Sequence, residues 1–146
     1  MNLRHIGIVV TDLNISKEFW CKALGGSIYS EMREKGEYID KMMGLQDVDV
    51  TTVKLKLPED DVGVELLHFH SHPADGPWKG TPYSIGLTHI AVTTDDIEKR
   101  YQHLKKIGIN FLEEPQYSPD GKVKVIYAQG PDNVFLEFVE VLNTDD

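Results

Sequence analysis

The feature that most constrains the fold of this 146-residue chain is a motif that occurs twice. Residues 5–13 read HIGIVVTDL and residues 89–97 read HIAVTTDDI. Each copy begins with a histidine, continues through an apolar run and ends near an acidic residue. Internal repetition of this kind usually reflects a repeated structural unit. We therefore expect one supersecondary unit to be used twice.

The first copy predicts a strand followed by a helix. The segment Leu3–Val10 is apolar at nearly every position, which is typical of a strand that is buried on both faces. Asp12 or Asn14 can cap the helix that follows, and Gly25 and Gly26 can end it. The apolar stripe expected on this helix consists of Ile15, Phe19, Trp20, Ala23 and Leu24.

The second copy predicts the same two elements in the same order. An apolar strand is expected over Leu87–Thr93, and Asp95, with Glu98 three residues later, is the expected cap of a helix. Gly108 is expected to end that helix. Its apolar stripe is formed by Ile97, Tyr101, Leu104 and Ile107.

Three strand-like stretches follow each helix, so the predicted unit is βαβββ. They are expected near Ser27–Glu34, Thr51–Leu57 and Val62–His70, and again near Asn110–Glu113, Lys122–Gln129 and Val134–Val141. The stretch GEYIDKMMG at residues 36–44 predicts a short helix or a lid. The proline- and glycine-rich residues 72–84 are the expected linker between module 1 (about 1–71) and module 2 (about 85–146), which together form one α+β domain.

Each copy also ends with a glutamate inside an apolar strand. Glu65 lies in VELL and Glu137 in LEFV. A buried carboxylate must be paired, protonated or bound to a metal. If a pseudo-twofold axis relates the two copies, His5 and His89 are equivalent, as are Glu65 and Glu137, and all four side chains can meet at one point.

These four side chains predict a site for one divalent metal ion. Two neutral imidazoles and two carboxylates balance the charge of the cation and suit Ni, Zn, Co, Mn or Fe. Octahedral coordination would leave two positions open for neighbouring oxygens of a small substrate. Negative charge that develops on those oxygens would be stabilised by the cation.

Composition excludes other classes of partner. The formal net charge of −9 argues against nucleic acid and anionic membranes, which both attract clustered Lys and Arg. The N-terminal residues MNLRHIGIVV do not match a secretory signal, and the sequence contains no long apolar run. We expect a cytoplasmic protein that acts on a small molecule.

Several other residues have a functional and a structural interpretation. His68, His70 and His72 resemble a second metal cluster, but strand alternation places positions 68 and 70 on the face opposite Glu65. Cys21 has no base nearby in the sequence and is expected to pack in the core. The possible pocket hydroxyls are Tyr38, Tyr83 and Tyr127, and the basic residues considered for anionic substrate groups are Arg4, Arg33, Lys35, Lys41, Lys122 and Lys124.

The motifs resemble those of the vicinal oxygen chelate superfamily, which includes glyoxalase I, methylmalonyl-CoA epimerase, bleomycin resistance proteins and extradiol dioxygenases. The resemblance is carried by HIGIVVTDL, FWCKALGG, VELLHF, HIAVTTDDI and DNVFLEFVEV. It implies that two βαβββ modules form a cupped, partly closed mixed sheet around a metal held by His5, Glu65, His89 and Glu137. It also implies a homodimer. Glu65 favours the glyoxalase I pattern, because the epimerases usually have Gln at this position.

The predicted activity is a metal-dependent isomerase, lyase or epimerase reaction. A carboxylate would remove a proton next to a carbonyl, and the divalent cation would stabilise the resulting enediolate. Glu137 is the preferred base and Glu65 the symmetric alternative. Two alternatives remain open at this stage: a non-catalytic binding protein of the bleomycin-resistance type, and an Fe(II) dioxygenase of the extradiol type.

Overall fold

The computed structural model describes residues 2–59 and 61–142. The chain divides into two compact units, Met1–Pro77 and Trp78–Asp146, here called unit 1 and unit 2. The order βαβββ occurs in both units, with one additional short helix in unit 1 and an interrupted strand in unit 2. The predicted α+β class is confirmed.

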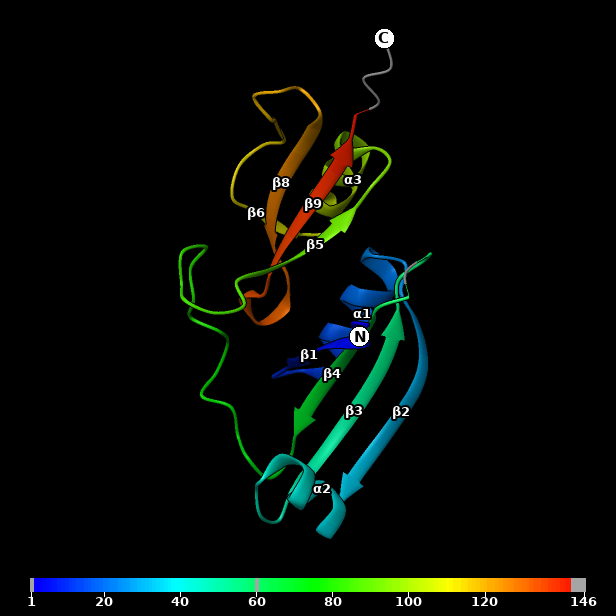
Figure 1. Ribbon diagram of the computed structural model, residues 1–146, viewed down its shortest axis with the longest axis vertical. Coiled ribbons are helices and arrows are strands. Elements are labelled where there is room, and N and C mark those ends of the chain that lie inside the picture. The colour runs from blue at the N-terminus through cyan, green and yellow to red at the C-terminus, as the bar shows by residue number, and fades with distance from the viewer. Residues whose placement is uncertain (1, 60, 143–146) are drawn as a thin grey trace. The chain divides into compact units, whose positions relative to one another are not determined.

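Unit 1 is built on a four-stranded mixed sheet (Figure 1). The strands are β1 (His5–Val9), β2 (Ser27–Lys35), β3 (Asp49–Lys56) and β4 (Gly63–Phe69), and their order in the sheet is β1-β4-β3-β2. β1 is parallel to β4, whereas the β3–β4 and β2–β3 pairs are antiparallel. The first and last strands of the repeat therefore become neighbours at one edge of the sheet.

The helix after β1 covers one face of this sheet and, as predicted, begins after Asp12 and ends before Gly25. The α-helix α1 (Leu13–Glu18) continues into one π-helical segment, η1 (Phe19–Ala23). Asp12 is the cap, and its Oδ1 accepts a hydrogen bond from the Ile15 backbone N–H at 2.9 Å. The prediction that Ile15 is buried is wrong, because its side chain is 59% exposed. Ser16 occupies the buried position instead, at helical spacing from Phe19, Trp20 and Ala23.

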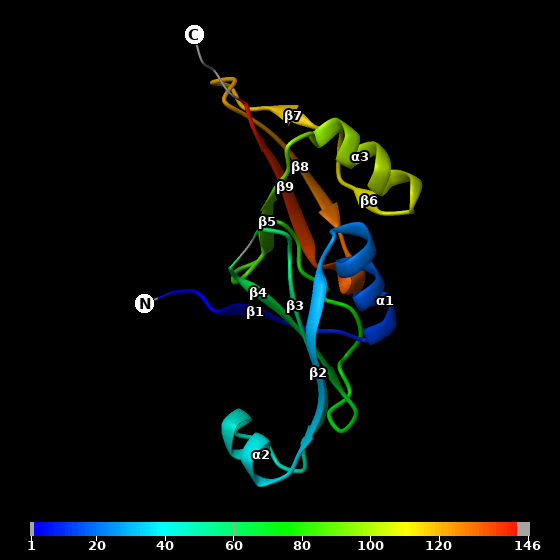
Figure 2. The same ribbon diagram turned by 90° about the vertical axis from the view of Figure 1, so that its right-hand side faces the viewer.

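The predicted short helix is confirmed as α2 (Glu37–Met43), and it lies on the other face of the sheet from α1 (Figure 2). Gly44 ends it with φ of 68°, a left-handed conformation that favours glycine. Ile39 is buried in a core cluster with Val48 and Val50, against which Leu67 and Phe69 pack. α2 thus packs against the end of β4 that carries Leu67 and Phe69, on the same sheet face as Glu65.

Unit 2 contains a second mixed sheet, in which one edge strand is interrupted. Its strands are β5 (His89–Thr93), β6 (Asn110–Phe111), β7 (Gln116–Tyr117), β8 (Val123–Gln129) and β9 (Phe135–Val141). The order is β5-β9-β8-β6, β7 also pairs with β8, and β5 is parallel to β9. A 3-10 turn, η2 (Pro131–Asn133), joins β8 to β9.

The strand predicted over Asn110–Glu113 is only partly correct. β6 ends at Phe111, and pairing resumes at Gln116 in β7. Phe111 is opposite Ala128 and Gln116 is opposite Val125, so the segment between them is longer than its partner on β8. Pro115 lies in this segment and cannot donate a backbone hydrogen bond to the ladder.

The helix of unit 2 is α3 (Ile97–Lys106), and its cap is Asp96 rather than the predicted Asp95. The Oδ1 atom of Asp96 accepts from the Lys99 backbone N–H at 2.9 Å. Ile97, Tyr101 and Leu104 are buried as predicted, whereas Ile107 follows the last helical residue and is 53% exposed. No helix in the described part of the chain is long and apolar enough to cross a membrane.

The two aspartates before α3 provide a matched test of this cap. Asp96→Ala removes the acceptor for the Lys99 N–H and should lower the free energy of unfolding by about 1 kcal/mol. Asp95→Ala should change it by less than about 0.5 kcal/mol, because Asp95 is exposed. Urea denaturation of both variants measures the difference. An equal loss in both, or a larger loss for Asp95→Ala, would contradict the cap assignment.

Burial of Ile39 should anchor α2 to the sheet. Ile39 is 1% exposed, so Ile39→Ala should lower the free energy of unfolding by about 2–5 kcal/mol. Met42, on the same helix, is 58% exposed, and Met42→Ala should have little effect. Chemical denaturation tests both variants. A small effect of Ile39→Ala would show that α2 is not packed as described.

Candidate metal centre

In unit 1, strand pairing brings His5 and Glu65 together. β1 and β4 run in parallel with Gly7 opposite Glu65 and His5 opposite Gly63, so the histidine lies diagonally across from the glutamate. His5 Nε2 is 3.1 Å from Glu65 Oε2. The Glu65 side chain is 14% exposed and that of His5 is 38% exposed. The pair is therefore partly sheltered but still reachable by a small molecule.

In unit 2, the same pairing brings His89 and Glu137 together. β5 and β9 run in parallel with Ala91 opposite Glu137 and His89 opposite Phe135. His89 Nε2 is 3.3 Å from Glu137 Oε2, and both side chains are only partly exposed. The histidine and the glutamate thus occupy the same positions of the ladder in both units.

Strand alternation explains why neither glutamate points into the core that lies between the sheet and α1 in unit 1, or between the sheet and α3 in unit 2. Successive side chains of a strand point to opposite faces of a sheet. On β4, Leu66 is fully buried, and on β9, Leu136 and Phe138 are at most 2% exposed. Glu65 and Glu137 alternate with these residues along the strands and are half-buried. The glutamates therefore project from the face opposite α1 in unit 1 and opposite α3 in unit 2.

The last glutamate of β9 has a structural contact. Glu140 lies three residues after Glu137 and therefore on the opposite face of the strand. Its Oε2 accepts a hydrogen bond from the Ile97 backbone N–H, at the N-terminus of α3, at 2.9 Å. A carboxylate at this position is stabilised by the free N–H groups and the dipole of the helix. Glu140 thus helps to attach α3 to β9.

A lysine distinguishes the unit 1 pair. Lys54 on β3 is directly opposite Glu65 on β4, and its Nζ is 3.5 Å from Glu65 Oε1. The other carboxylate oxygen of Glu65 faces His5. Glu65 therefore lies between an imidazole and an ammonium group. The sequence patterns do not single out Lys54, because only the β3–β4 register brings it beside the glutamate.

A tyrosine and a threonine surround the unit 2 pair. Tyr127 on β8 is directly opposite Glu137, and its hydroxyl lies 3.3 Å from Nδ1 and 3.4 Å from Nε2 of His89. Burial, and to a smaller extent the charge of Glu137, raises the pKa of Tyr127 above its ordinary value, so the phenol is protonated at neutral pH. Thr88 Oγ1 is 3.0 Å from His89 Nδ1. This hydroxyl can fix the orientation of the imidazole.

Both pairs have the chemistry and spacing of two neighbouring metal ligands. Each offers one imidazole nitrogen and one carboxylate oxygen, the atoms that bind Zn and related divalent cations. Two such ligands at right angles, each about 2.1 Å from a cation, would lie roughly 3 Å apart. The observed separations are 3.1 and 3.3 Å. Among the described residues, no group of three or more His, Cys, Asp or Glu side chains is placed to hold a metal, and each pair contains two of the four predicted ligands.

The three histidines at positions 68, 70 and 72 make hydrogen bonds. His68 Nδ1 contacts the Val10 carbonyl oxygen at 3.2 Å, His70 Nε2 contacts Thr51 Oγ1 at 2.8 Å, and His72 Nδ1 contacts Ser71 Oγ at 2.7 Å. The rings of His68 and His70 pack edge to face. None of these contacts involves Glu65, in agreement with the face expected from strand alternation.

Several of the basic residues considered for anionic substrate groups have carboxylate partners. Arg33 and Lys35 both pair with Asp49, and these cations hold the pKa of Asp49 well below its usual range. Lys41 pairs with Glu37 and Lys124 with Glu98. Their charges are therefore partly neutralised within the protein. Cys21 is half-buried within η1.

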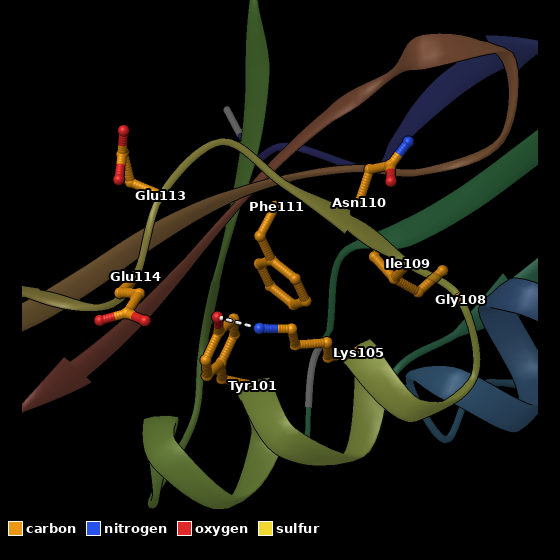
Figure 3. A pocket seen from close by; sticks show the side chains of 8 residues that line it. All are labelled: Tyr101, Lys105, Gly108, Ile109, Asn110, Phe111, Glu113 and Glu114. Carbon is orange, nitrogen blue, oxygen red and sulfur yellow. Dashed lines mark hydrogen bonds between the residues drawn. The ribbon is translucent and has the colours of Figure 1, made fainter.

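A separate pocket lies between α3 and β6 in unit 2 (Figure 3). Its volume is about 450 Å³. The ring of Phe111 packs edge to face on that of Tyr101 at 4.9 Å, and Lys105 Nζ donates a hydrogen bond to the Tyr101 hydroxyl at 2.9 Å. The lining residues are Tyr101, Lys105, Gly108, Ile109, Asn110, Phe111, Glu113 and Glu114, and they include none of the predicted ligands.

A family model and two related sequences each match more than nine-tenths of the chain. The model of a family described as the Glyoxalase/Bleomycin resistance protein/Dioxygenase superfamily matches residues 2–138. The chain is 27% identical to the uncharacterized protein YwbC of Bacillus subtilis, over 93% of this chain and 94% of that protein. It is 26% identical to a lactoylglutathione lyase of Neisseria meningitidis, over 100% of this chain and 95% of that protein.

Solved structures share the fold. A glyoxalase family protein from Bacillus cereus superposes with a TM-score of 0.88 at 21% identity, covering 98% of this chain and 95% of that chain. A mutant of glyoxalase I from Zea mays superposes with a TM-score of 0.70 at 21% identity, covering 97% of this chain and 47% of that chain. At this identity the likeness concerns the fold.

The contact between Thr88 and His89 generates a test of the metal prediction. When a metal occupies Nε2, the ring proton is on Nδ1, where the Thr88 hydroxyl can accept it. Thr88→Val should therefore weaken metal binding by about 10- to 100-fold. Thr93→Val, an exposed position at the end of the same strand, is the control and should bind normally. Calorimetric titration with Co²⁺ measures both, and equal affinities would exclude this role of Thr88.

Proposed function

The chain belongs to the glyoxalase/bleomycin resistance protein/dioxygenase superfamily, and from this premise we propose that it is a metal-dependent lyase, isomerase or epimerase. The observation that carries the proposal is the repetition of one His–Glu pair at identical ladder positions in both units. A half-buried glutamate on a strand needs a partner for its charge, and in both units a histidine lies beside it.

His5, Glu65, His89 and Glu137 would hold the cation in the proposed site. A bound divalent cation supplies Lewis-acid stabilisation of negative charge on substrate oxygens. The imidazoles contribute neutral nitrogen ligands, and the two carboxylates balance the charge. The partial burial of the glutamates limits the access of water and strengthens these electrostatic interactions.

Glu137 is the proposed base. Its counterpart, Glu65, lies beside the ammonium of Lys54, which partly neutralises the Glu65 charge. Glu137 instead lies opposite Tyr127, whose protonated phenol carries no charge. Glu137 Oε2 would accept the proton from the carbon next to the substrate carbonyl and return it to the neighbouring carbon or to the other face. The protein gains and loses no atoms in this cycle.

The proposal extends to the substrate, the oligomeric state and the cellular location of the protein. The substrate is a small molecule with two neighbouring oxygens, and the lactoylglutathione lyases among the relatives make the hemithioacetal of methylglyoxal and glutathione the first compound to assay. Acyl-CoA substrates of an epimerase are the second class. We propose a cytoplasmic homodimer, in keeping with the small-molecule chemistry of the site.

Replacement of Glu137 tests the proposed chemistry. Glu137→Gln should lower turnover by about 10²- to 10⁴-fold, because an amide cannot accept the proton. Glu140→Gln is the control on the same strand: it lies on the opposite face and keeps an oxygen acceptor for the Ile97 N–H. The measurements are turnover and exchange of the substrate proton with deuterated solvent, using protein loaded with Ni²⁺, Co²⁺, Zn²⁺ or Mn²⁺.

Three outcomes are informative. Loss of both turnover and exchange in Glu137→Gln alone supports the role of Glu137 as base. Full retention of exchange would overturn it and transfer the role to Glu65. Tight binding of small molecules without turnover or exchange in any metal form would instead identify a binding protein.

A further inference from the structure

The two halves of the proposed site differ in the residue opposite the glutamate. In the β3–β4 ladder Lys54 is opposite Glu65, and in the β8–β9 ladder Tyr127 is opposite Glu137. These two positions are equivalent in the repeat. One half therefore contributes an ammonium group, and the other contributes a phenol hydroxyl.

The backbone at Lys54 lies between buried residues, and the Lys54 side chain is partly exposed. Its strand neighbours Val53 and Leu55 are fully buried, which fixes the backbone at this position. Its own side chain is 39% exposed. The distance of 3.5 Å from Nζ to Glu65 Oε1 exceeds the 2.7–2.9 Å or so of a strong charge-assisted hydrogen bond. Because an ammonium has three donors, Lys54 can bind another acceptor without leaving Glu65.

The charge of a loaded site would favour an anionic acceptor. The two glutamates balance a divalent cation, and the two neutral histidines add no charge. Lys54 then adds one positive charge that Glu65, already shared with the cation, cannot neutralise. An excess positive charge in a partly buried site is stabilised by an anion that binds there.

We propose that Lys54 binds a carboxylate of the substrate, so that the preferred substrate is a small 2-oxo- or 2-hydroxycarboxylate. This inference rests on the proposed function, because it assigns the substrate class of the same site. The carboxylate and its neighbouring oxygen supply the two adjacent oxygens that the site requires. Lys54 would hold the charged end of the substrate beside Glu65. Lys54 is thus a specificity-determining residue.

Three isosteric probes separate charge from shape. Oxalate, oxamate and oxamide present the same pair of neighbouring oxygens but carry two, one and no negative charges. The affinity of each is measured by calorimetry on Co²⁺-loaded wild-type protein and on Lys54→Met and Lys54→Arg. Lys99→Met, an exposed residue on α3, is the control for the loss of one positive charge.

We expect Lys54→Met to weaken oxamate binding by about 10- to 100-fold while oxamide binding is unchanged. Lys54→Arg should recover most of the affinity, and Lys99→Met should leave it within about twofold. Metal uptake should be equal in all four proteins. Unchanged oxamate affinity in Lys54→Met, or an equal loss for oxamide, would overturn the inference.

The metal measurement separates this inference from the proposed function. If wild-type protein does not take up a divalent cation, the proposed function fails and the role of Lys54 fails with it. If wild-type protein binds the metal but Lys54→Met does not, Lys54 supports Glu65 and does not select the substrate. If the metal binds equally and only the selectivity for carboxylates is absent, the inference alone is wrong.

Discussion

In each unit a carboxylate lies beside an imidazole on two adjacent parallel strands, and the proposed site depends on this placement. A glutamate in the middle of a core strand is costly unless it has a partner. The parallel pairing of the first and last strands of each unit supplies that partner, because it sets His5 diagonally across from Glu65 and His89 diagonally across from Glu137. The βαβββ order is what brings the first and last strands together.

The repeat also shows where the two units have diverged. Unit 1 has Lys54 opposite its glutamate and the helix α2 on the same sheet face, packed against Leu67 and Phe69. Unit 2 has Tyr127 at the corresponding position and orients its histidine with Thr88. The two His–Glu pairs are thus alike, whereas the residues around them differ.

Sequence patterns predict the architecture well because the signals that define it are local. Apolar strands, helix stripes and closing glycines lie within one element, so the βαβββ order and the helix α2 are confirmed. The errors occur where two neighbouring residues offer the same chemistry or where pairing breaks. Asp95 and Asp96 can both cap a helix, and only the backbone conformation selects Asp96. The additional residues between β6 and β7 are recognised only from the pairing of these strands with β8.

The surroundings of the proposed ligands depend on contacts between distant parts of the sequence. Lys54 becomes relevant only when the register of β3 and β4 is known, and Thr88 only when the direction of the His89 ring is known. Basic residues that appear available in the sequence, such as Arg33 and Lys124, have carboxylate partners in the structure. The His–Glu repetition, by contrast, is visible in the sequence because each histidine begins a copy of the repeated motif and each glutamate lies in the apolar run of a last strand.

The most direct measurement is the number of divalent cations bound per chain when either pair is removed. Chelator-stripped wild-type protein, the double variant His5→Ala, Glu65→Gln and the double variant His89→Ala, Glu137→Gln would each be titrated with Co²⁺. If the two pairs share one cation, wild-type protein binds one ion per chain and each double variant loses tight binding. Two ions per chain, with one retained in each variant, or no binding to wild-type protein would contradict a shared metal centre.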